Sequence, residues 1–154
     1  MKERMLRWEW YPYQRLSTDQ LYSILALRQR VFIVEQRCPY LDADGYDVHA
    51  WHLTGLDERS TPVAYLRLID PGRRFPEPSI GRVMTHPAVR GKGFGIALMK
   101  EGLRKASELY PGRRVRISAQ RYLEQFYSTL GFVPAGKPYD EDGILHIEMV
   151  HGAE

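Results

Sequence analysis

A short glycine-rich stretch, RGKGFG at residues 90–95, stands directly before a helical pattern and constrains the fold more than any other feature of the chain. Three of its residues are glycines, accompanied by one Arg and one Lys. The apolar residues that follow recur at intervals of three and four, which predicts one buried helical face. These residues are Ile96, Met99, Leu103, Ala106 and Tyr110. The chain therefore places a flexible, basic turn at the start of an amphipathic helix.

A turn of this kind is suited to an anion. The first N–H groups of a helix have no partner within the helix, and the helix dipole adds partial positive charge there. Glycines let backbone amides turn inward and let a phosphate approach closely. One interpretation is a pyrophosphate cradle. The other is a loop whose glycines only satisfy a tight turn.

Two common phosphate-binding motifs do not fit this stretch. A Walker A loop requires Ser or Thr after Gly-Lys, whereas Gly93 follows Lys92. The dinucleotide fingerprint G-x-G-x-x-G does not fit either, because its third glycine would fall on Ile96 if the motif began at Gly91, or on Leu98 if it began at Gly93. The spacing that remains is R-x-x-G-x-G over residues 90–95.

The rest of the chain alternates helical and strand-like segments. Ser17 and Gln20 form a capping-box pattern at the start of a helix predicted over residues 17–32, with Leu21, Ile24, Leu25 and Phe32 on its buried face. Strands are predicted over residues 49–56, 62–69, 79–86, 114–119 and 144–150, with another strand after residues 131–136 and a short helix over 121–130. This order predicts an α/β (α+β) fold, a mixed sheet with helices packed on it. Without a repeat or linker, the 154 residues are expected to form a single domain, 1–154.

Composition excludes several classes of protein. A net charge of +3 without a Lys/Arg block does not favour a nucleic-acid partner. No apolar run of 18 residues or N-terminal apolar core is present, so we expect neither a membrane span nor a signal peptide. Cys38 is the only cysteine, which fits a reducing, cytoplasmic location and a small buried side chain rather than a nucleophile.

Four blocks resemble the GNAT superfamily of N-acetyltransferases. Residues 80–99, with R-x-x-G-x-G after a strand ending in His-Pro, resemble its coenzyme A loop. Residues 119–132 resemble its second conserved block, in which a helix ends in Tyr-x-x-x-Gly-Phe, here from Tyr127. Residues 27–47 and 141–149 are similar to the ElaA-type branch in particular.

The resemblance implies one acyl-CoA N-acyltransferase domain with a mostly antiparallel sheet, splayed fourth and fifth strands and helices on both faces. It places the pyrophosphate of acetyl-CoA, the co-substrate, on the backbone of Arg90, Gly91, Lys92, Gly93, Phe94 and Gly95. The pantetheine arm would pair with the main chain of Val83, Met84 and Thr85. Gln120 stands where many members have an Asn that contacts the coenzyme. No zinc spacing or complete calcium loop is present, so no metal is expected.

Acetyl transfer to an amine requires a base, an oxyanion donor and an acid for the leaving thiolate. Tyr127 matches the family position of that acid, and a core aromatic is the alternative. His146 is the first candidate base and Glu35 the second, and a water-relayed base is equally compatible with the sequence. The remaining candidates are His52, His86, Glu148 and the acidic loop with Asp42, Asp44 and Asp47. That loop is expected to be solvated or, if functional, to attract a cationic substrate.

The expected function is an acetyl-CoA-dependent N-acetyltransferase that works by direct attack in a ternary complex. A non-catalytic acyl-CoA-binding sensor or scaffold is the alternative, and a nucleotide-binding module is a third. The acceptor would be a small-molecule amine or a protein amine. An exposed final strand would allow a homodimer by pairing with a second copy.

Overall fold

A mixed sheet organises the chain, whose computed structural model describes residues 5–152. Its strands are β1 (Arg7–Pro12), β2 (Ala50–Leu56), β3 (Pro62–Ile69), β4 (Ser79–Thr85), β5 (Val115–Gln120), β6 (Val133–Pro134), β7 (Tyr139–Glu141) and β8 (Ile144–His151). The α-helices are α1 (Thr18–Arg28), α2 (Phe94–Leu109) and α3 (Glu124–Thr129). A π-helical turn, Gln29–Glu35, continues α1, and short 3-10 turns lie at Tyr13–Arg15, Asp47–His49, Pro87–Val89 and Arg121–Leu123.

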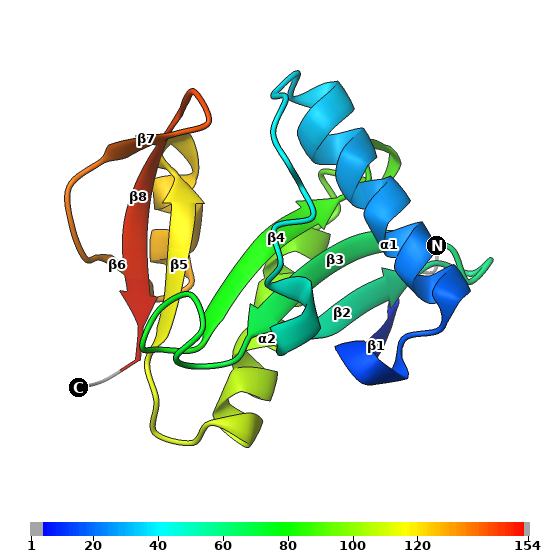
Figure 1. The fold of residues 1–154 in the computed structure, drawn as a ribbon, viewed down its shortest axis with the longest axis horizontal. Coiled ribbons are helices and arrows are strands. Elements are labelled where there is room, and N and C mark those ends of the chain that lie inside the picture. The colour runs from blue at the N-terminus through cyan, green and yellow to red at the C-terminus, as the bar shows by residue number, and fades with distance from the viewer. Residues whose placement is uncertain (1–4, 153–154) are drawn as a thin grey trace.

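The strand order is β1-β2-β3-β4-β5-β8-β6, with β7 also paired to β8. Every pairing is antiparallel except that of β4 with β5. In the described chain these two strands share one register pair, Ser79 with Arg116, and then diverge (Figure 1). The expected fold class is therefore confirmed, including the splay between the fourth and fifth strands.

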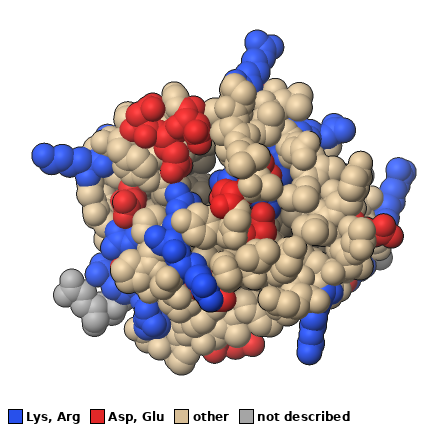
Figure 2. Space-filling view, viewed as in Figure 1, with Lys and Arg blue, Asp and Glu red and all other residues tan. Residues whose placement is uncertain are grey.

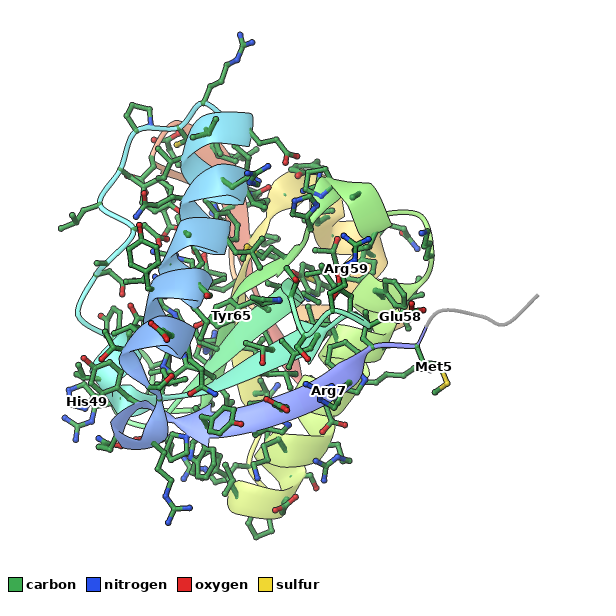
Figure 3. The ribbon with its side chains drawn as sticks, turned by 90° about the vertical axis from the view of Figure 1, so that its right-hand side faces the viewer. Met5, Arg7, His49, Glu58, Arg59 and Tyr65 are labelled. Atoms are coloured by element: carbon green, nitrogen blue, oxygen red, sulfur yellow. The ribbon has the colours of Figure 1, made fainter. Side chains whose placement is uncertain are left out.

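Helices cover both faces of the sheet. Successive side chains of a strand point to opposite faces, so Tyr65 and Leu66 of β3 mark the two sides. Ile24 and Leu27 of α1 pack against Tyr65, which lies beneath that helix in Figure 3. On the other side, α2 approaches so closely that a Cβ on Gly102 would lie 2.9 Å from Leu66 Cδ2.

The helix predicted over residues 17–32 is divided in the structure. Its start is confirmed, because the Ser17 hydroxyl accepts from the Gln20 N–H while the Gln20 side chain accepts from the Ser17 N–H. The α-helix ends at Arg28, and the widened turn that follows includes a bond from the Gln36 N–H to Val31 O. Apolar spacing of three to four does not distinguish these two helical forms.

The predicted buried face of α2 is correct except at its beginning. Met99 and Ala106 are buried, but Ile96 is 42 % exposed, so its assignment to the core was wrong. Phe94, the first helical residue, makes the apolar contact of the first turn, and Leu98 one turn later is fully buried. Ile96 lies two positions away from each of them, on the opposite side of the helix.

The strand β1 was not predicted. It pairs with β2, and its alternation is clear in retrospect, since Trp8 and Trp10 pack against the core while Arg7 and Glu9 pair with each other. The first four residues of the N-terminal stretch judged to lack a signal peptide are outside the described residues. Within residues 5–152, no helix is long and apolar enough to cross a membrane.

The final strand is not an exposed edge, contrary to the expectation from sequence. β8 pairs with β5 on one side and with both β6 and β7 on the other. β7 reaches Glu141, so Asp142 and Gly143 alone form the turn into β8. The reason given for pairing with a second copy was therefore wrong.

Candidate active site

A cavity of about 670 Å³ lies where β4 and β5 diverge. One wall is β4, the other is formed by β5, α3 and β8, and the segment from Val31 to Tyr46 contributes the remaining side. Figure 2 shows this region as a hollow between the two halves of the molecule, with acidic side chains inside it and near the β7–β8 hairpin. Because β5 has turned away, the β4 edge that faces the cavity has no strand neighbour beyond Ser79 in the described chain.

The β4 wall contains a bulge. Tyr65 is opposite Met84 and Arg67 is opposite Gly81, so two residues of β4 face the single Leu66 of β3. Arg82, one of those two, has a left-handed φ of +51°. Val83, the second residue of the bulge, and Met84 and Thr85 after it are the residues expected to pair with a pantetheine arm, and all three line the cavity. Sequence reasoning did not identify Arg82 as part of the site.

The glycine turn lies between β4 and α2. Gly91 and Gly93 have φ values of +79° and +78°, and Gly93 is the N-cap of α2. No heavy atom lies within 4 Å of the position that a Cβ would occupy at either glycine. The turn can thus bring backbone amides close to a bulky anion. Phe94 buries its side chain in the core, so only its backbone can face such a ligand.

Arg90 connects the glycine turn to the segment from Val31 to Tyr46, which forms the third side of the cavity. Its guanidinium donates to both carboxylate oxygens of Glu35 and, at 3.1 and 3.2 Å, to the backbone oxygen of Thr85. Both Arg90 and Glu35 line the cavity and are partly exposed. Glu35, a candidate base, is therefore engaged by a cation in this structure. Lys92 is exposed in the same turn.

Tyr127 combines the two roles considered for it. Its ring packs edge-on against Phe126 and Phe132 in the core, and the residue also lines the cavity. Within residues 5–152 its hydroxyl has no hydrogen-bond partner. Burial, with a smaller contribution from Tyr122, raises the pKa of Tyr127 well above its ordinary value. The phenol consequently keeps its proton at neutral pH.

His146 is buried and lies on the far wall of the cavity, opposite Gln120 in the β5–β8 register. Its Nδ1 is 2.8 Å from the Ile144 carbonyl oxygen, which can only accept, so Nδ1 carries the proton. Its Nε2 is then the atom that can take up a proton, and Glu141 Oε2 lies 3.3 Å away. The Tyr139 ring stacks against the imidazole and fixes its orientation.

The other histidines have structural partners. His52 is fully buried, its Nε2 donates to the Asp47 carbonyl at 2.9 Å, and its Nδ1 accepts from the Tyr65 hydroxyl at 2.6 Å. Burial lowers the pKa of His52, so the ring is neutral with both nitrogens occupied. The Nδ1 of His86 accepts from the Ala88 N–H and caps a 3-10 turn. In each ring Nδ1 carries the lone pair and already accepts a hydrogen bond, so neither neutral imidazole has a lone pair free to act as a base.

The remaining candidates are placed as follows. Gln120 lines the cavity and donates to the Gln36 side chain at 3.3 Å. Glu148 pairs with Arg116 and does not contribute to the cavity wall. Cys38 is buried, lines the cavity, and its thiol donates to the Asp142 backbone oxygen at 3.0 Å.

The acidic loop is not solvated, which corrects the expectation from sequence. Its three aspartates alternate with three arginines from α1, β3 and β4 in a closed ring of ion pairs, with N···O distances of 2.6–3.2 Å. In ring order, these residues are Arg28, Asp47, Arg67, Asp44, Arg82 and Asp42. We refer to them as the Arg–Asp ring. Each charge has two opposite partners, so the loop has no free negative charge with which to attract a cationic substrate.

Two carboxylates of the ring, those of Asp44 and Asp47, are stabilised in their ionised forms. Burial by itself would raise the pKa of Asp44, but the hydrogen bonds and charge of Arg67 outweigh it and lower the pKa to about 2. The same balance, with Arg28 and Arg67 as partners, keeps the pKa of Asp47 below its ordinary value. The sequence did contain a signal for the ring. Arg28 stands among Ile24, Leu27 and Val31 on an apolar stripe, where an unpaired charge would be costly.

A metal site is not apparent, because no group of three or more His, Cys, Asp or Glu side chains within residues 5–152 could hold an ion. The site instead offers an unpaired strand edge, a helix N-terminus behind a glycine turn, and a phenol and an imidazole on the opposite wall. The strand edge and the helix N-terminus can bind a ligand, and the phenol and the imidazole can transfer a proton.

Comparison with known proteins gives consistent matches over most of the chain. Residues 47–151 match the family described as "Acetyltransferase (GNAT) domain". The UPF0039 protein sll0451 of Synechocystis is 46 % identical over 94 % of both chains, and the protein ElaA of Escherichia coli is 39 % identical over 94 % of this chain and 95 % of its own. A crystal structure described as an acyl-CoA N-acyltransferase from Pseudomonas aeruginosa superposes with a TM-score of 0.91, is 40 % identical, and covers 96 % of this chain and 99 % of its own.

Proposed function

The chain belongs to the GNAT acetyltransferase family, and from that premise we propose that it transfers an acetyl group from acetyl-CoA to an amine. The observation that carries the proposal is the cavity between β4 and β5, which joins an unpaired strand edge to the glycine turn before α2. The description of the Pseudomonas relative as an acyl-CoA N-acyltransferase supports the same donor class. We propose acetyl-CoA as the donor and a small-molecule or protein amine as the acceptor.

The residues present fit a coenzyme A thioester. The open space at Gly91 and Gly93 and the free N–H groups at the start of α2 are suited to its pyrophosphate. Its pantetheine arm contains amides that can pair with the free edge of β4 along residues 83–85, as an added strand would. Gln120, on the facing wall, can donate a hydrogen bond to the same arm or accept one from it.

The acceptor must be a neutral amine before it can attack. A free alkylamine has a pKa of about 10.4, so removing its proton at pH 7 costs roughly 4 to 5 kcal/mol. His146 is our first choice of base, because its Nε2 faces Glu141, which stabilises the proton once it is taken up. Glu35 remains the second choice, available once Arg90 moves to a phosphate, and a water could relay the proton to either.

Transfer would then proceed in one ternary complex. The amine nitrogen forms a bond to the thioester carbonyl carbon, and a backbone N–H of β4 stabilises the resulting oxyanion. The C–S bond breaks as the intermediate collapses, and the leaving thiolate takes the phenol proton of Tyr127. The acceptor ammonium gives up two protons: one passes through the base to solvent before the attack, and the second leaves the nitrogen as the intermediate collapses and restores the Tyr127 phenolate. The coenzyme has gained the phenol proton, so the step is balanced and needs no covalent enzyme intermediate. We further propose a single domain, residues 1–154, acting in the cytoplasm, where a lone thiol such as Cys38 stays reduced.

Thermal unfolding with and without acetyl-CoA tests the proposal, with NAD and ATP at the same concentration as controls. A ligand at one hundred times its dissociation constant stabilises the native state by about 2.7 kcal/mol, which raises the midpoint of a chain of this size by roughly 5 to 10 °C. We expect this shift with acetyl-CoA only. A shift with ATP or NAD but not with acetyl-CoA would show a nucleotide-binding module instead.

A further inference from the structure

The bulge in β4 is held in a conformation that its sequence disfavours. Arg82 has a φ of +51°, a region that glycine enters freely and other L-residues enter at a cost. A glycine stands directly before it, at position 81, yet the left-handed residue is the arginine. Something outside the backbone must therefore stabilise this conformation.

The Arg–Asp ring supplies that stabilisation. Arg82 Nε donates to Asp42 Oδ1 at 2.8 Å, and Arg82 Nη2 donates to the Asp42 backbone oxygen and to Asp44 Oδ2, both at 3.2 Å. These acceptors are fixed in turn, because Arg28 also binds Asp42 and Arg67 also binds Asp44. The guanidinium of Arg82 also stacks over Tyr40. Its side chain is thus held from α1, from β3 and from the 42–47 loop together.

The conformation of Arg82 affects the cavity wall directly. The three residues that follow Arg82 in β4 are those that face the cavity with a free strand edge, and the bulge sets the direction of their N–H and C=O groups. Resting on the proposed function, we infer that the Arg–Asp ring is a positioning device for the coenzyme. By holding Arg82 left-handed, it prepares residues 83–85 to pair with the pantetheine arm, and Arg82, Asp42 and Asp44 are positioning residues.

A substitution series at position 82 separates this role from simple structural support. Arg82→Ala, Arg82→Asn and Arg82→Gly all remove the same ring contacts, but they tolerate a positive φ in the order Ala, Asn, Gly. We expect the dissociation constant for acetyl-CoA, measured by titration calorimetry, to rise by roughly 5- to 30-fold in Arg82→Ala, less in Arg82→Asn, and to stay within about twofold of the native value in Arg82→Gly. The unfolding midpoint should fall in the same order, because the strain is carried by the folded state, so affinities are compared at a temperature well below every midpoint, where each variant is folded.

Two results would overturn the inference. One is equal weakening in Arg82→Ala and Arg82→Gly, which would mean that the side chain rather than the bulge serves the coenzyme. The other is native affinity in Arg82→Ala. Circular dichroism reports whether each variant folds, and if Arg82→Ala does not, the comparison of Arg82→Asn with Arg82→Gly decides the question.

Hydrogen exchange of the coenzyme-free proteins keeps the inference distinct from the proposed function. We expect amides of residues 80–85 to exchange faster in Arg82→Ala than in Arg82→Gly, because only the glycine variant retains the bulge. Similar exchange in both would show that the ring does not set the bulge. If the native protein fails to bind acetyl-CoA, the proposed function fails, and the exchange comparison still decides what holds Arg82.

Discussion

Replacing Gly93 with alanine tests whether the glycine turn serves a ligand or only a bend. Gly93 has a φ of +78°, and a Cβ there would meet no heavy atom within 4 Å. The substitution therefore adds backbone strain without a steric clash. That strain is worth roughly 1 to 2 kcal/mol, which lowers the unfolding midpoint of a chain of this size by about 2 to 8 °C.

Gly112 provides a matched control. It lies in the turn between α2 and β5, has a φ of +75°, and also has nothing within 4 Å of its virtual Cβ. Gly112→Ala should lower the unfolding midpoint by a similar amount, because the strain is the same. It lies outside the cavity and should leave the affinity for acetyl-CoA within about twofold of the native value.

The two variants should differ in calorimetric titration with acetyl-CoA. In Gly93→Ala the free turn can relax away from the left-handed conformation, and binding must then restore it. The dissociation constant should rise by up to about 30-fold, according to the share of the 1 to 2 kcal/mol that relaxation relieves in the free protein, and the fall in unfolding midpoint should be smaller by the same share. If Gly93→Ala loses stability as Gly112→Ala does but binds acetyl-CoA normally, the turn is only a bend and the coenzyme does not lie on it.

Three further predictions concern the cavity walls and the ring. Tyr127→Phe should lower turnover, measured by thiol release, by about 10²- to 10⁴-fold, while thermal unfolding should show unchanged stability. A non-catalytic sensor would show no turnover in the native protein either. Glu35→Gln should tighten acetyl-CoA binding by up to about fivefold, because it releases Arg90 to bind the coenzyme. Glu108→Gln, at an exposed position outside the cavity, is the control. If Glu35 is instead the base, its substitution should lower kcat. The pKa of Asp44 is about 2 in the native state and 3.8 in the unfolded chain, so the stabilisation that its ionised form provides is complete above pH 3.8 and is lost as the pH falls towards 2. Between pH 4 and pH 2 the free energy of unfolding of the native protein should fall by roughly 2 kcal/mol more than that of Asp44→Asn. An equal fall in both proteins would contradict the ion pairing of Asp44.

Local signals in the sequence predicted most of the helices and the glycine turn. The capping box of Ser17 and the left-handed glycines before α2 depend on residues within a few positions, so their structural consequences can be read from the chain itself. Strand β1 is difficult to recognise from sequence, because Trp8 and Trp10 alternate with the charged Arg7 and Glu9 over only a few positions. Its recognition required the partner strand β2, some forty positions later.

The Arg–Asp ring could not be read from sequence in the same way. Its arginines at positions 28, 67 and 82 lie on three different elements, and their convergence on one loop is a property of the tertiary fold. What the sequence does show is an arginine within two apolar segments, at Arg28 and Arg67. Since a buried charge is paired in nearly every stable protein, such arginines predict that partners exist without saying which ones.

The walls of the cavity differ in how firmly they are held, and this bears on how a coenzyme enters. The β4 wall is fixed by the buried Arg–Asp ring, in which removing any one member would leave an uncompensated charge. The contacts that cross the cavity are instead single polar pairs near the surface, such as Arg90 with Glu35, Arg74 with Glu141, and Gln120 with Gln36. These pairs are partly exposed, and surface pairs of this kind are worth about 0 to 1 kcal/mol each, so they can open and re-form at little cost. A thioester could therefore displace the crossing contacts while the strand edge that receives its arm stays in place.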